Sequence, residues 1–95
     1  MTIEAAVGEI IRGVPAGRAF DSHYIIKSLI RAHSDMYLRF AAEYSASRKT
    51  TLTVHQQIGG VISSFEGTLV DRLDLDSWSF NVHCRPGKCA LWRRR

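Results

Sequence analysis

The sequence predicts a single α+β domain in which three to four helices precede a C-terminal β-hairpin, spanning residues 1–95. Apolar residues recur at helical spacing through the first two thirds of the chain, and after Gly67 the pattern changes to one typical of strands. A Pro86-Gly87 pair then separates two short strand-like segments. The composition, 45% hydrophobic and 23% charged, is that of a folded globular protein rather than a disordered chain.

The N-terminal part is expected to form a platform of helices. Residues 2–14 have an amphipathic pattern that predicts a helix ending before Pro15. Residues 14–20 are then a short connection, and Asp21 is placed to cap a second helix. Two interpretations remain for the residues after this cap: Ser34 caps a third helix, or one long bent helix runs from Ser22 to Ala46.

The next helix is the central element of the predicted fold. Thr53 followed by Gln56 has the form of a capping box, so we expect this helix to begin near Thr53. It should end near Glu66, with Gly67 in the left-handed conformation, although a helix that continues to Leu73 also keeps the apolar period. One face carries the apolar residues Val54, Ile58, Val61, Ile62 and Phe65.

Two glycines interrupt this helix. Gly59 and Gly60 each cost roughly 1 kcal/mol relative to alanine, so we expect close approach of another surface to offset them. That surface is either a neighbouring helix in the same core or a DNA backbone or base edge. We favour packing inside the core, because isolated helix glycines usually have a structural reason.

The C-terminal third is expected to form a hairpin at residues 78–93, in which Arg85 to Lys88 make a type II turn. Trp78 and Trp92 should pack on the helices, whereas a tryptophan exposed on the hairpin could stack or wedge at DNA. The predicted segments, in order, are a strand at 68–73, a polar turn at 74–77, a half-buried strand at 78–82 and its partner at 90–92.

Cys84 and Cys89 flank this turn and would face each other in a non-hydrogen-bonded pair. They are therefore a candidate redox pair, although reduced bystander thiols are the preferred interpretation for a cytoplasmic protein. With His83 they supply only three donors and no CxxC motif, so we expect no metal ion and no cofactor. We expect a cytoplasmic location, because the sequence has no apolar run of about 20 residues and no secretory leader pattern.

An enzymatic role finds no support in the motifs. The sequence has no glycine-rich phosphate loop, nucleophile elbow or HExxH motif. Asp71, Asp74 and Asp76 lack the glycine and terminal glutamate of a calcium loop. The formal charge of +4 and a pI of about 9.5 instead favour an anionic partner. The excess of positively charged residues lies near the C-terminus, where residues 93–95 are expected to form a basic tail.

The segment Phe65-Glu66-Gly67-Thr68-Leu69-Val70-Asp71-Arg72 resembles the passage from recognition helix to wing strand in bacterial winged-helix regulators. The order of elements over nearly the whole chain is similar to that of small bacterial winged helix-turn-helix DNA-binding proteins. The resemblance implies that the helix starting at Thr53 enters the major groove of duplex DNA while the hairpin tip touches the backbone. The candidate DNA contacts are Arg48, Lys49, Thr53, His55, Gln56, Gln57, Ser63, Arg85, Lys88, Arg93, Arg94 and Arg95.

One departure from that family is that the proposed groove helix contains no lysine or arginine, the residues used most against guanine and phosphate. This lack of basic residues favours a second hypothesis, in which the chain is a winged-helix adaptor that binds a protein partner instead of DNA. RNA is a third candidate partner, because the charge pattern does not distinguish the two nucleic acids. The sequence does not predict an oligomeric state.

Overall fold

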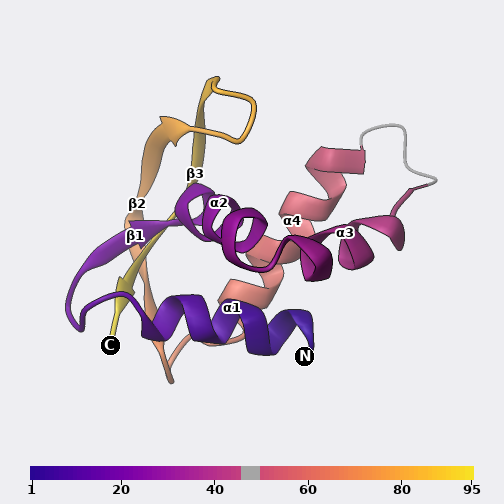
Figure 1. Ribbon diagram of the computed structural model, residues 1–95. Coiled ribbons are helices and arrows are strands. Elements are labelled where there is room, and N and C mark those ends of the chain that lie inside the picture. Colours follow the sequence, from indigo (N-terminus) through magenta and orange to yellow (C-terminus); the bar gives the residue numbers. More distant parts are fainter. Residues whose placement is uncertain (46–49) are drawn as a thin grey trace.

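The computed structural model describes residues 1–45 and 50–95 of an α+β protein with four helices and a three-stranded antiparallel sheet. The strands have the order β1-β3-β2, so the C-terminal strand lies in the middle. The helices lie beside the sheet, and the turn of the β2–β3 hairpin projects past α2 (Figure 1). The elements are α1 (Ile3–Arg12), β1 (Ala19–Asp21), α2 (Ser22–Ala32), α3 (Ser34–Ala42), α4 (Thr50–Ser63), β2 (Val70–Phe80) and β3 (Pro86–Arg94).

The first helix confirms the prediction for residues 2–14. The Thr2 side chain accepts a hydrogen bond from the backbone N–H of Ala5 and so caps α1. The segment after it is more than a simple connection, because Ala19–Asp21 forms β1 and Phe20 pairs with Trp92 of β3. A three-residue strand carries no periodic signal of its own, and only its partner far along the chain defines it.

The second and third helices are separate, so the single bent helix from Ser22 to Ala46 is wrong. Asp21 caps α2 as predicted, and its Oδ1 accepts the N–H of Tyr24 at 2.8 Å. The break falls at His33, which occupies the N-cap position of α3 without a side-chain cap bond. Ser34 is therefore the first residue of α3 rather than its cap.

The buried face of α4 is confirmed, since Val54, Ile58 and Ile62 are fully buried. The boundaries differ from the prediction at both ends. The helix begins at Thr50, which places Thr53 inside it and not at its cap, and it ends at Ser63. Extension to Leu73 is wrong, and Gly67 has the predicted left-handed conformation, with φ of +87°. None of the helices in the described residues has the length and apolar character needed to cross a bilayer.

The strand β2 is continuous through the residues expected to form a polar turn. Its register with β3 shifts between Arg72, which pairs with Trp92, and Asp76, which pairs with Ala90. Three residues of β2, Leu73 to Leu75, therefore lie opposite one residue of β3, Leu91, and this bulge lets the strand continue through the predicted polar turn. The predicted break is wrong because the bulge absorbs the additional residues without ending the strand.

The hairpin turn also differs from the prediction. Phe80 pairs with Pro86, so residues 81–85 make the connection and the type II turn at Arg85 to Lys88 is wrong. The side chain of Asn81 holds this connection, because its Oδ1 accepts the N–H groups of His83 and Arg85 at 2.9 and 3.2 Å. Asparagine favours such local bonds to the backbone.

The two tryptophans have opposite environments. Trp92 is 3% exposed and belongs to the core, as predicted, whereas Trp78 is 66% exposed. The hydroxyls of Ser77 and Ser79 point toward Asp21, so the alternating side chains Trp78 and Phe80 lie on the opposite face. The expectation that Trp78 packs on the helices is therefore wrong.

The glycines of α4 have open surroundings. A Cβ atom added at Gly59 or Gly60 would meet nothing within 4 Å among the described residues, so the prediction that these glycines pack closely inside the core is wrong.

We expect Gly60→Ala and Gly59→Ala each to raise the free energy of unfolding by about 0.5–1 kcal/mol, because alanine restricts the unfolded chain. Urea denaturation measures the change in the free energy of unfolding. Gly67→Ala is the control and should destabilise the protein, because of its positive φ. A destabilising Gly60→Ala would contradict the open environment.

Candidate functional site

A hollow of about 380 Å³ lies between α4, the start of α2 and the hairpin. A second hollow lies beside the hairpin turn, and Asn81 borders both. Among the described residues that line them, the charged side chains are Lys27, Arg31 and Lys88, and there is no carboxylate. The lining of the first hollow is Ser22, His23, Ile26, Leu52, His55, Gln56, Gly59, Asn81, Gly87, Lys88, Cys89 and Ala90.

The predicted contact residues on α4 divide into two groups. Gln56, Gln57 and Ser63 are exposed, and Gln56 lines the first hollow. Thr53 and His55 are half-buried. Arg48 and Lys49, which precede the helix, lie outside the described residues.

His55 is engaged in packing between two helices. Its Nε2 is 2.9 Å from the hydroxyl of Tyr37 on α3. Burial, together with the charges of His83 and His23, lowers the pKa of His55 below its ordinary value. The side chain is therefore neutral at pH 7, and it does not supply the positive charge that a phosphate contact would use.

The two predicted contact residues of the hairpin are exposed. Arg85 lies in the connection, and Lys88 lies on β3 opposite Trp78. Trp78 and Phe80 share the outer face of β2 and are 66% and 59% exposed. The distal part of the hairpin thus combines cations with exposed aromatic side chains.

The C-terminal arginines do not form a tail beside the hairpin turn. Arg93 and Arg94 belong to β3, and the Nε of Arg94 donates to the carbonyl of Ile11 at 3.2 Å. Arg95 donates to the carbonyl of Gly67 at 2.7 Å and lies 3.5 Å from the Asp71 carboxylate. Eight residue steps along β3 at about 3.3 Å place these groups about 26 Å from the turn.

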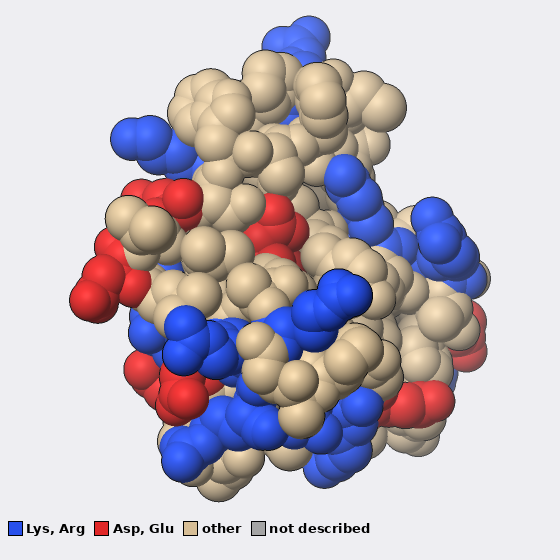
Figure 2. Space-filling view, turned by 90° about the vertical axis from the view of Figure 1, so that its left-hand side faces the viewer, with Lys and Arg blue, Asp and Glu red and all other residues tan. Residues whose placement is uncertain are grey.

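The prediction of a basic tail at residues 93–95 is corrected, because Arg93 and Arg94 are part of β3. Figure 1 shows the C-terminus at the opposite end of the hairpin from its turn. In Figure 2, lysine and arginine side chains gather over the lower part of the molecule, and fewer surround the hairpin above. The basic residues form two groups because β3 runs the length of the sheet between them.

A polar cluster at the start of α2 was missed by sequence reasoning. The hydroxyls of Ser77 and Ser79 both donate to Asp21 Oδ2 at 2.7 Å, and His23 Nδ1 is 2.8 Å from Ser79 Oγ. Burial favours a higher pKa for Asp21, but these hydrogen bonds, with those from Tyr24 and the charge of His23, outweigh it and lower the pKa. The signal in the sequence, alternating serines on a strand, becomes informative only once the register is known.

The two cysteines do not face each other. Cys89 pairs with Ser77 in the sheet, whereas Cys84 lies in the connection, so the predicted cross-strand pair is wrong. Both thiols are free. Burial raises the pKa of Cys89, which favours the protonated thiol over the reactive thiolate.

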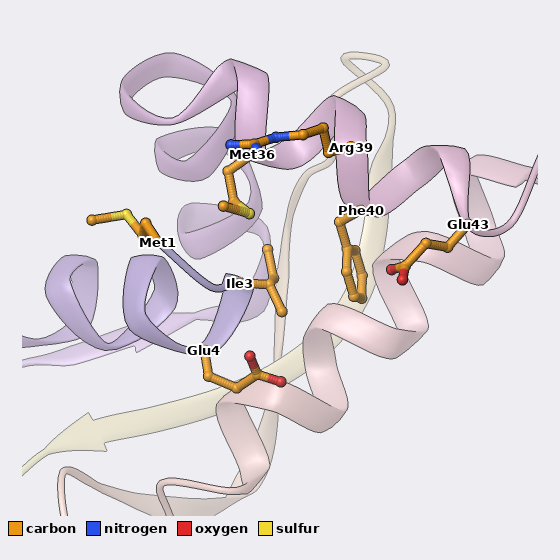
Figure 3. Close-up of a pocket in the computed structure, with 7 residues that line it drawn as sticks. All are labelled: Met1, Ile3, Glu4, Met36, Arg39, Phe40 and Glu43. Atoms are coloured by element: carbon orange, nitrogen blue, oxygen red, sulfur yellow. The ribbon is translucent and has the colours of Figure 1, made fainter.

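A third hollow lies between α1 and α3 (Figure 3). Ile3, Met36 and Phe40 form its apolar part. The charged ends of Glu4, Arg39 and Glu43 point in different directions and do not converge on one position (Figure 3). This arrangement does not identify a ligand.

The fold and the two adjoining hollows define an α+β protein with a carboxylate-free surface between a helix and a hairpin. Comparisons of the chain with protein-family models, with curated proteins and with solved structures found no match.

Proposed function

We propose that this chain is a winged-helix protein that binds duplex DNA, with α4 in the major groove and the hairpin turn on the phosphate backbone. The observation that carries the proposal is the hollow that α4 shares with the hairpin. Gln56 and Lys88 both line this hollow, and no described residue that lines it has a negative charge. The order of elements and the β1-β3-β2 sheet are compatible with a winged helix.

The exposed face of α4 suits close approach to base edges. Gln56, Gln57 and Ser63 are exposed on it, and Gly60 leaves open space where a side chain would stand. A glutamine amide can bond bidentately to adenine N6 and N7 in the major groove. Glycine lowers the stability of the helix, and packing in the core does not explain why Gly60 is present. Close access of the helix to DNA would explain it.

The cations around the hairpin suit phosphate. Arg85 and Lys88 are exposed on the hairpin, and Lys27 and Arg31 of α2 line the neighbouring hollow. Each phosphate that a cation neutralises releases counterions, so affinity should fall steeply with salt. Arg93, exposed at the other end of β3, is placed to contact a separate part of the backbone, whereas Arg94 and Arg95 already bond to other groups of the protein.

The proposal is tested by fluorescence anisotropy with a labelled random-sequence duplex, titrated at several salt concentrations under reducing conditions. We expect Arg85→Ala with Lys88→Ala to weaken binding to all sequences. It should also flatten the slope of log affinity against log salt by about 1.8, since each lost phosphate contact contributes about 0.9. Gln56→Ala should instead change sequence preference.

The matched control is Arg12→Ala with Arg39→Ala, which removes the same charge from helices α1 and α3. It should change the slope much less. No binding of the wild-type protein at low salt, or an equal effect of the two double variants, would contradict the proposal.

The second candidate is a winged-helix adaptor that binds a protein partner. Three large apolar side chains favour it, since Leu52 on α4 and Trp78 and Phe80 on the hairpin are more than half exposed. The absence of lysine and arginine from residues 50–63 favours it too. Leu52→Ala with Phe80→Ala distinguishes the two functions, because it removes apolar surface that an adaptor needs for its partner and leaves Gln56, Arg85 and Lys88 in place for DNA. The same anisotropy titration with a labelled RNA duplex tests RNA, the third candidate partner.

A further inference from the structure

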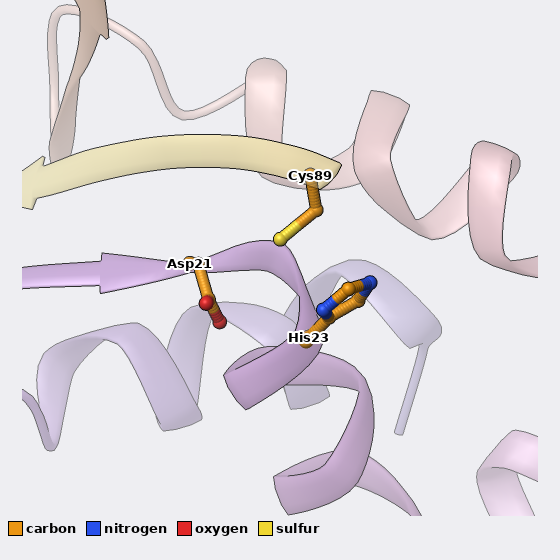
Figure 4. Close-up of side chains that lie close together, drawn as sticks. All are labelled: Asp21, His23 and Cys89. Atoms are coloured by element: carbon orange, nitrogen blue, oxygen red, sulfur yellow. The ribbon is translucent and has the colours of Figure 1, made fainter. Parts of the chain in front are cut away.

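Three side chains with metal-binding atoms converge at the start of α2. One atom each from Asp21, His23 and Cys89 lies within 4.8 Å of the other two. They come from β1, α2 and β3, so the tertiary fold and not a local motif brings them together. Figure 4 shows the carboxylate, one ring nitrogen and the sulfur pointing into the same space.

We propose that Asp21, His23 and Cys89 bind one divalent transition-metal ion of the zinc type. A thiolate with an imidazole and a carboxylate suits Zn²⁺ or Co²⁺, whereas Mg²⁺ and Ca²⁺ prefer oxygen ligands alone. The set shares only Cys89 with the three donors that the sequence suggested, because His83 and Cys84 lie in the hairpin connection.

The fold holds the backbone of all three residues. Asp21 pairs with Leu91 in the sheet, Cys89 pairs with Ser77, and His23 lies in the first turn of α2. The hydroxyls of Ser77 and Ser79 fix the Asp21 carboxylate, as outer hydrogen-bond partners do at metal sites. A metal at His23 Nδ1 replaces the bond to Ser79 Oγ, and Ser79 keeps its bond to Asp21.

Three protein ligands leave a fourth position for water. His23 and Cys89 both line the hollow between α4 and the hairpin, so this position is open to solvent on that side. Binding converts the Cys89 thiol into a metal-bound thiolate and releases its proton to solvent. The metal site does not depend on DNA binding, and it is tested without nucleic acid.

The first test is titration of the reduced protein with Co²⁺, monitored by absorption. We expect saturation at one equivalent, a thiolate-to-cobalt charge-transfer band, and loss of the band when Zn²⁺ is added. Cys84→Ser should keep the band and Cys89→Ser should lose it. Asp21→Asn retains a good helix cap but removes the charge, so it should weaken binding by about 100-fold.

The second measurement uses only the wild-type protein and so does not depend on the folding of a variant. Zn²⁺ should slow alkylation of Cys89 by about tenfold or more and leave Cys84 unchanged, as followed by peptide mass spectrometry. Equal rates with and without Zn²⁺, or a charge-transfer band that persists in Cys89→Ser and is lost in Cys84→Ser, would overturn the proposal.

Discussion

Replacing Trp92 with alanine is expected to lower the free energy of unfolding by about 4 kcal/mol. The side chain is 3% exposed in the core between the sheet and the helices. Its Nε1–H donates to Ser22 Oγ at 3.1 Å, and Ser22 is itself buried. The substitution therefore leaves a cavity and also removes the partner of a buried hydroxyl. The guanidinium of Arg72, 5.5 Å from the ring centroid, loses its aromatic neighbour as well.

Two further variants separate these contributions. Trp92→Phe keeps most of the apolar ring but removes the donor to Ser22, so we expect a smaller loss of about 1–3 kcal/mol. Trp78→Ala is the control, because the Trp78 side chain is 66% exposed, and it should change stability by no more than about 0.5 kcal/mol. Urea denaturation followed by circular dichroism measures all three. A Trp78→Ala variant as unstable as Trp92→Ala would show that the face of β2 is assigned incorrectly.

Asp21→Ala is expected to lower the free energy of unfolding by about 3 kcal/mol, because the carboxylate caps α2 and accepts two serine hydroxyls. About 1 kcal/mol comes from the lost cap and about 1 kcal/mol from each hydroxyl left without its acceptor. Asn is also a good cap, so Asp21→Asn should cost less. Equal losses in the two variants, measured by urea denaturation, would contradict the role assigned to the cap.

The contribution of Asp21 to the free energy of unfolding should also depend on pH. The pKa of Asp21 in the folded protein is lowered from its ordinary value of 3.8, so the unfolded chain binds its proton first as the pH falls. The stabilisation is therefore fully present well above pH 3.8 and is lost as the pH falls through the folded pKa. Thermal unfolding as a function of pH should show the wild type and Asp21→Asn converging in acid. A difference that stays constant into strong acid would contradict this linkage.

The sequence by itself determined the features that depend on local patterns. The apolar period of α1 and of α4 identified their buried faces, because a helix places every third or fourth residue on one side. The cap at Asp21 and the left-handed Gly67 were predicted from side-chain and backbone chemistry within a few residues. The presence of a C-terminal hairpin came from the same local signals, which left the number of helices at three or four.

Strand pairing was decided by the tertiary structure. Neither β1 nor the bulge in β2 has a local signature, since each is defined by distant residues of β3. The predicted hairpin register is wrong by several residues because the side chain of Asn81 forms the connection ahead of Pro86. The start of α4 at Thr50 was missed because the pair Thr53 and Gln56 matches a capping box without being one.

The candidate sites depend on that register. Alternate residues of a strand point to opposite faces, so the pairing determined that Ser77 and Ser79 meet Asp21 while Trp78 is exposed. The same pairing brought Cys89 beside His23 and away from Cys84. It also placed Arg94 and Arg95 at the far end of the sheet from the hairpin turn. Local sequence determined which residues are buried in the helices, and long-range hydrogen bonding in the sheet determined which side chains come together.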